Sequence, residues 1–94
     1  MIQPQLDLFE SEEAALIADC ETALYLYDKA DRDDAEERYA DYLDLVETGT
    51  ELLAGLRDNF ASTLDEETEE EYVAEFNRSV LKRLPRFAVE IEET

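Results

Sequence analysis

Histidine and tryptophan are absent from this chain of 94 residues, and cysteine occurs once, at Cys20. Without histidine, the chain lacks the commonest general base and the commonest transition-metal ligand. A single cysteine excludes an intramolecular disulfide, and the position of Cys20 among apolar residues predicts a buried, inert thiol. The sequence also shows no glycine-rich phosphate loop and no zinc-type cysteine pair. These absences predict a protein that is not an enzyme and that uses no metal or cofactor.

Glycine and proline are scarce, at two residues each, whereas Ala, Leu and Glu dominate and favour helix. Apolar residues make up 45% of the chain, so the composition is not that of a disordered protein. A chain of this length forms one domain with one core. The sequence shows neither a signal peptide nor an apolar run long enough to span a bilayer. We therefore expect a cytoplasmic protein without membrane contact.

Basic residues are few as well: eight face 27 acidic residues, and the net charge is −19. Because phosphate binding requires cationic groups, this balance argues against direct binding of nucleic acid. Opposite potentials steer association, so the expected partner is a protein with a basic or apolar groove. The same acidity is also typical of adaptation to high salt, and the composition does not separate these two explanations.

The order of apolar and polar residues predicts an all-α protein, an antiparallel three-helix bundle with a long central helix. An N-terminal lead segment (1–10) precedes the three-helix domain (11–84), and a C-terminal tail (85–94) follows it. The predicted helices cover residues 11–30, 33–62 and 65–84.

Capping and breaking residues set these boundaries. Pro4 favours extended backbone before it, and Ser11 is a good N-cap for the first helix. Asp65 is the expected N-cap of the third helix, and Pro85 ends that helix. Apolar and polar residues alternate from Val89 onward, which favours a short extended segment in the tail.

The central helix carries the most regular apolar pattern. Its apolar residues alternate steps of four and three, which is a heptad seam, and the phase continues across Gly49. We predict one long helix with Gly49 as a point of close packing; a kink at Gly49 is the alternative. Four leucines lie off the best stripes, leave surplus apolar surface and predict a homodimer: Leu26, Leu43, Leu45 and Leu52. The seam residues are Ala35, Tyr39, Tyr42, Val46, Gly49, Leu53, Leu56 and Phe60.

Glutamates crowd the first turns of the predicted third helix. Acidic side chains are favoured there by the helix macrodipole. The run has charge on too many faces to be a ligand set, and a ferritin-like di-metal site would also need a Glu-x-x-His motif. We interpret it as a solvated acidic surface. Its members are Glu66, Glu67, Glu69, Glu70 and Glu71.

One stretch near the N-terminus has the pattern of a docking peptide: Gln5, Leu6, Asp7, Leu8 and Phe9. These five residues resemble the peptide with which bacterial polymerases and repair proteins dock on the DNA sliding clamp, Gln-Leu-(Ser or Asp)-Leu-Phe. The resemblance implies an extended peptide whose Leu8 and Phe9 enter an apolar cleft of the clamp. It further implies that Leu6 is a secondary anchor and that Gln5 forms a hydrogen bond at the rim.

An alternative interpretation makes the same residues part of the fold. Leu6, Leu8 and Phe9 then fold back on the bundle as a lid, with Phe9 stapled to the first helix turns. Docking would have to compete with folding in that case. The related archaeal and eukaryotic clamp box matches at Gln3, Leu6 and Phe9, but Glu10 stands where its second aromatic residue belongs.

Three non-catalytic functions are consistent with these features. The first is a protein–protein interaction adaptor or regulator, which in its sharper form docks on the sliding clamp through Gln5, Leu6, Leu8 and Phe9. The second is an acidic DNA mimic that inhibits a basic protein. The third is a small helical assembly subunit of a larger complex.

Overall fold

Helices make up almost the whole chain. The computed structural model describes residues 2–94, and no strand occurs among them; Met1, the first residue of the predicted lead segment, lies outside the described residues. The predicted all-α class with a long central helix is therefore confirmed. The elements are α1 (Ile2–Glu12), α2 (Ala14–Lys29), α3 (Arg32–Ala61), α4 (Glu66–Arg83), the 3₁₀ turn η1 (Pro85–Phe87) and α5 (Ala88–Glu93).

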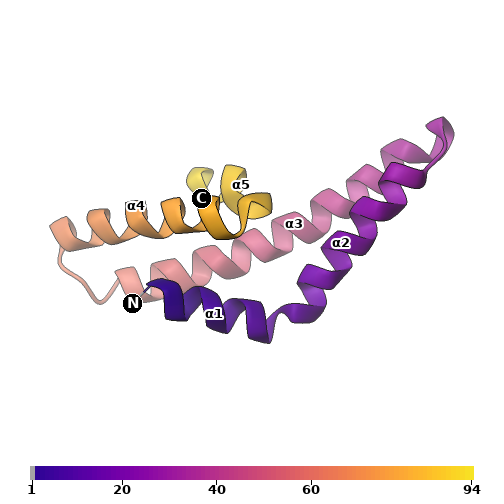
Figure 1. Ribbon diagram of the computed structural model, residues 1–94. Helices are drawn as coiled ribbons and strands as arrows, with labels where there is room; N and C mark the ends of the chain where they lie inside the picture. Colours follow the sequence, from indigo (N-terminus) through magenta and orange to yellow (C-terminus); the bar gives the residue numbers. More distant parts are fainter. Residues whose placement is uncertain (1) are drawn as a thin grey trace.

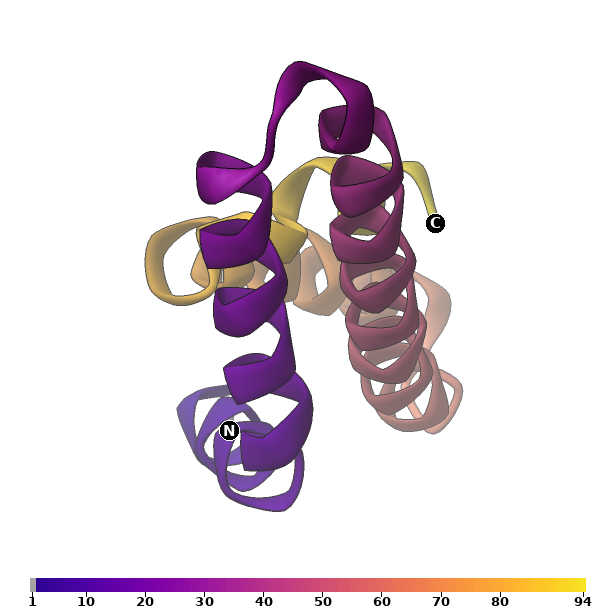
Figure 2. The ribbon, with the colours of Figure 1, turned by 90° about the vertical axis from the view of Figure 1, so that its right-hand side faces the viewer.

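The long helix α3 is the axis of an elongated molecule that measures 51 × 24 × 19 Å. Helix α2 lies along the N-terminal half of α3, and the two form a hairpin that projects from the rest of the chain (Figure 1). Helices α4 and α5 gather at the other half, and α1 packs against α4 and the start of α2 (Figure 1). Figure 2 looks at the hairpin from its tip and shows α2 and α3 side by side. Among residues 2–94, the hairpin tip is formed by the end of α2 and the start of α3.

The residues from Ile2 onward are helical, so the prediction that helix begins only at Ser11 is wrong. Pro4 lies in the first turn of α1, where a missing N–H costs no intrahelical hydrogen bond. Helix α1 continues past Ser11, the predicted N-cap. The helical conformation is interrupted at Glu13, whose φ is −108° and ψ is 26°. The reason is burial: Leu6 and Phe9 both enter the core. Each such side chain stabilises the fold by about 1.5–3 kcal/mol, against about 1 kcal/mol for a cap.

The C-terminal tail is helical as well, so the predicted extended segment is wrong. Helix α4 ends before Pro85, as predicted, and η1 then leads into α5. Phe87, Ala88 and Ile91 are buried, and their spacing is that of one helix face. The apparent alternation from Val89 misled the prediction because Val89 faces solvent, with 73% of its surface exposed.

Gly49 lies within a continuous α3 and is a point of close packing, as predicted. A Cβ atom at this position would lie 2.8 Å from Cζ of Phe87, so a side chain there would force the Phe87 ring to shift. The Phe87 ring in turn meets the Phe9 ring edge to face, with centroids 6.0 Å apart and planes at 85°. The missing side chain of Gly49 thus lets both ends of the chain join α3 in a single core, which offsets the cost of about 1 kcal/mol for glycine within a helix.

Arg57 is buried in the same half of α3 although it carries a charge. Its Nη1 donates to the carbonyl oxygen of Ile91 and to Oδ1 of Asn77, both at 3.0 Å, and its Nε donates to Oδ1 of Asp58 at 2.8 Å. Among residues 2–94 no buried side-chain nitrogen or oxygen lacks a hydrogen-bond partner. Arg57 therefore ties α4 and α5 to α3 and is a structural residue.

Candidate protein-interaction surface

The clamp-like pentapeptide lies within α1. Leu6 and Phe9 are buried in the core, whereas Leu8 is 50% exposed. The Tyr72 hydroxyl donates a hydrogen bond of 2.6 Å to Oε1 of Gln5. Burial raises the pKa of Tyr72, so this hydroxyl stays protonated. This is the geometry expected when these residues belong to the fold.

Arg83 of α4 holds α1 at its other edge. The guanidinium donates to the carboxylate of Asp7, to Oε1 of Glu10 at 3.1 Å and to Oε1 of Gln3 at 2.9 Å. The hydrogen bonds to Asp7 and Glu10 raise the pKa of Arg83. Docking of residues 5–9 as an extended peptide would break these contacts and withdraw two side chains from the core, so it requires α1 to unwind.

The acidic run at the start of α4 is exposed throughout. Asp65 is its N-cap, as predicted: a carboxylate oxygen accepts the Thr68 backbone N–H at 2.8 Å, which lowers the pKa of Asp65. Within residues 2–94 no group of three or more acidic or cysteine side chains is arranged to hold a metal ion. The run has the geometry of a solvated helix start. Its exposed glutamates are Glu66, Glu67, Glu69, Glu70 and Glu71.

Cys20 lies in α2 and its side chain is fully buried. Burial is the main cause that raises the pKa of its thiol, and the neighbouring Asp19 and Glu21 raise it further, although Arg86 acts in the opposite direction. A buried thiol with a raised pKa remains protonated and unreactive near neutral pH.

One face of α3 changes character halfway along the helix. Eight residues recur on it at steps of three and four, which places them on one side of the helix. The last four are buried on the side where α4 and α5 pack. The first four are exposed, although Tyr39 and Leu43 among them are large and apolar, at 43% and 39% exposed. We call these the covered strip (Thr50, Ala54, Arg57 and Ala61) and the open strip (Glu36, Tyr39, Leu43 and Glu47).

Aromatic contacts hold the open strip in place. The Tyr39 ring lies 5.1 Å from the Tyr27 ring of α2 and 6.2 Å from the Tyr42 ring, measured between centroids. Tyr42 in turn accepts a hydrogen bond of 3.2 Å from Nε of Arg86 in η1. The apolar part of the strip is therefore positioned by both helices of the hairpin and by the segment that follows α4.

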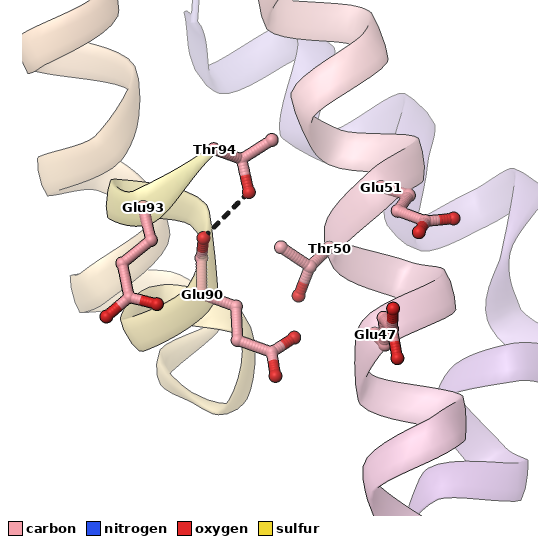
Figure 3. Close-up of a pocket in the computed structure, with 6 residues that line it drawn as sticks. All are labelled: Glu47, Thr50, Glu51, Glu90, Glu93 and Thr94. Atoms are coloured by element: carbon pink, nitrogen blue, oxygen red, sulfur yellow. Dashed lines mark hydrogen bonds between the residues drawn. The ribbon is translucent and has the colours of Figure 1, made fainter.

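A hollow of about 430 Å³ lies between α3 and α5, where the open strip meets the covered strip (Figure 3). Figure 3 shows the side chain of Glu90 reaching from α5 toward α3. The hydroxyls of Thr50 and Thr94 donate internally, to the carbonyl oxygens of Val46 and Glu90, each at 2.8 Å. The wall is thus dominated by free carboxylates. The lining residues are Glu47, Thr50 and Glu51 of α3 and Glu90, Glu93 and Thr94 of α5.

Sequence reasoning found part of this surface and missed the rest. Of the four leucines identified as surplus, Leu26, Leu43 and Leu52 are exposed. Leu45 is partly buried and packs against the core, so it was wrongly included. Sequence reasoning missed the acidic hollow because α5 was expected to be extended. The signal for α5 was present in the helical spacing of Phe87 and Ile91.

No helix among residues 2–94 combines the length and the apolar character that crossing a bilayer demands. The surface on α3 consists of an apolar patch, carboxylates at both ends of that patch, and a hollow beside it. Comparison of the chain with protein-family models, with curated proteins and with solved structures finds no match.

Proposed function

We propose that this chain is a non-catalytic, acidic helical protein of the cytoplasm that binds protein partners as an adaptor or regulator. The observation that carries the proposal is the open strip: the face of α3 that α4 and α5 cover in one half continues, with the same spacing, into a half that neither of these helices covers and where Tyr39 and Leu43 stay 43% and 39% exposed. Contiguous apolar surface rimmed by polar residues is typical of protein–protein contact sites.

The exposed apolar side chains support this proposal by their position. Isolated exposed leucines are normal on a protein surface. Here, however, four exposed apolar residues all lie in the hairpin, where α2 and α3 pack against each other: Tyr25, Leu26, Tyr39 and Leu43. A partner that packs against the hairpin would remove this surface from water.

Cross-linking tests the proposal because the chain has only two lysines, Lys29 at the end of α2 and Lys82 in α4. The tagged chain is recovered from its own cells, treated with a lysine-reactive cross-linker and analysed by mass spectrometry. We expect a stoichiometric partner whose cross-links go to Lys29 and not to Lys82. A partner attached only through Lys82 would contradict a role for the hairpin.

Matched variants make the same experiment specific. Tyr39→Ser combined with Leu43→Ser should abolish recovery of the partner. The control combines Leu52→Ser with Leu81→Ser, two leucines of similar or greater exposure that lie outside the open strip. Equal loss of the partner in both double variants, or no stoichiometric partner at all, would rule out the proposal.

The other functions expected from the sequence stay predictions. Clamp docking through residues 5–9 requires release of α1, and Leu8→Ala is its clean test because Leu8 is exposed while its neighbours Leu6 and Phe9 support the core. A DNA mimic should lose affinity steeply as salt rises. The homodimer and the assembly subunit both predict association through exposed apolar surface, which sedimentation measures.

A further inference from the structure

We infer that the partner element seated on the open strip is a basic amphipathic helix about three turns long. This inference rests on the proposed function and names the chemistry of the partner. Three features of the strip carry it: the continuity with a face that already holds helices, the apolar centre, and the charge around that centre.

Continuity with the covered strip argues for a helix. Helices α4 and α5 occupy the covered side of α3, and Arg57 joins all three through Asn77 and Ile91. The open strip continues the same three-and-four spacing toward the hairpin tip, so it presents the same kind of ridge to a neighbour. From Glu36 to Glu47 it measures about 16 Å at about 1.5 Å per residue, which matches about three turns of helix.

The centre of the strip supplies the apolar contact. Tyr39 and Leu43 lie one turn apart and each leaves about two fifths of its surface exposed. The Tyr27 and Tyr42 rings fix the position of Tyr39, so little side-chain entropy is lost when it is covered. A row of apolar side chains at helical spacing on the partner would cover both residues at once.

Charge selects a basic partner. Glu36 and Glu47 stand at the two ends of the strip, and the Glu47 end opens into the hollow that also holds Glu51, Glu90 and Glu93. Residues 19–47 carry eleven acidic and three basic side chains. A second copy of this chain would bring like charge against like charge, whereas lysines and arginines beside an apolar stripe would be attracted.

A defined peptide tests the inference. The probe is an amidated 14-residue helical peptide with a leucine stripe on one face and lysine and arginine on the others; a second peptide has the same composition with the leucines scattered. Fluorescence anisotropy at low salt should show the striped peptide binding at least tenfold more tightly to the full chain. A third peptide, with the same stripe and glutamine in place of the cations, should bind at least tenfold more weakly than the first.

Variants separate the strip from general attraction between opposite charges. The charge-neutral pair Tyr39→Ser with Leu43→Ser should weaken binding of the striped peptide at least tenfold, and Leu52→Ser with Leu81→Ser should leave it unchanged. Circular dichroism verifies that both variants keep their helices. Equal binding of striped and scattered peptides, or equal loss in both double variants, would overturn the inference.

Two further outcomes distinguish this inference from the proposed function. If the cross-linked partner of the hairpin proves to be acidic, or docks without a helix, the inference fails while the proposed function stands. If the chain dimerises in sedimentation through Tyr39 and Leu43 and does not bind the striped peptide, the open strip is a self-contact and the inference is wrong.

Discussion

The covered and open strips of α3 share one helix, one face and one spacing, yet only the covered strip belongs to the core. Thr50, Ala54 and Ala61 in the covered strip are small, and small side chains allow neighbouring helices to approach closely. The open strip instead places large side chains, Tyr39 and Leu43, between two glutamates. The covered strip also holds Arg57, whose charge is enclosed because it is hydrogen-bonded to Asn77 and Ile91. Spacing along one helix face therefore does not by itself tell which half of the face is enclosed.

The two halves also differ in what holds them. The covered half receives both ends of the chain, through Phe9 of α1 and Phe87 of η1, together with the hydrogen bonds of Arg57. The hairpin half is held by contact between two helices and by a few aromatic pairs. Regions with few buried apolar contacts open at lower free energy, so the hairpin is the half suited to adjust to a partner.

The largest expected effect on stability concerns Phe87, whose ring connects α1 to α3 in the covered half. Phe87→Ala should lower the free energy of unfolding by about 3–5 kcal/mol, because it removes a fully buried ring and leaves a cavity against Gly49 and Phe9. Leu43→Ala in the open strip should cost about 1 kcal/mol or less, since Leu43 is already part exposed. Urea unfolding at fixed salt measures both. Similar losses would mean that the two halves are equally well packed.

The sequence was sufficient for the features that local signals determine. The heptad phase across Gly49 predicted one continuous α3, Asp65 predicted the start of α4, and Pro85 predicted its end. Each of these signals acts within a few residues of the position it determines. The exposed leucines of the hairpin were also visible as residues off the main stripe.

The two ends of the chain were mispredicted because long-range contacts decide their structure. Ser11 and Pro4 indicated a boundary, but burial of Phe9 against Phe87, far away in the sequence, keeps α1 helical. The tail likewise becomes helical because Phe87 and Ile91 meet α3. Tertiary burial overrides local propensity in short segments like these. The hollow beside α5 could not be foreseen without that helix.

Replacing the two glycines of α3 should change stability by an intermediate amount, and Gly55 serves as the control for Gly49 because it lies in the same helix. Gly49→Ala should destabilise the fold by about 1–3 kcal/mol, because the new Cβ meets the Phe87 ring and the core must shift. Gly55→Ala should instead stabilise it by about 0.5–1 kcal/mol, since no atom lies within 4 Å of a Cβ there and alanine favours helix. Thermal and urea unfolding of the two single variants measure this contrast. A neutral Gly49→Ala would show that the contact with Phe87 is loose.

The smallest expected effect on stability is at Asp65, the N-cap of α4, which lies outside both strips. Its replacement tests whether α4 can be destabilised without affecting the hairpin. Because the hydrogen bond from the Thr68 N–H lowers the pKa of Asp65 in the folded state, its stabilising effect is present above the pKa of the unfolded chain. That effect is lost as the pH falls from about 4, the ordinary pKa of an aspartate, through the lower folded value. Unfolding measured between neutral and acid pH should therefore show Asp65→Ala less stable than the charge-matched control Glu70→Ala at pH 7, with the gap closing in acid. If the stability difference between the two variants stays constant with pH, the Asp65 carboxylate does not act through its charge. If Asp65→Ala also disrupts the contacts of Tyr39, the structure of the hairpin depends on α4.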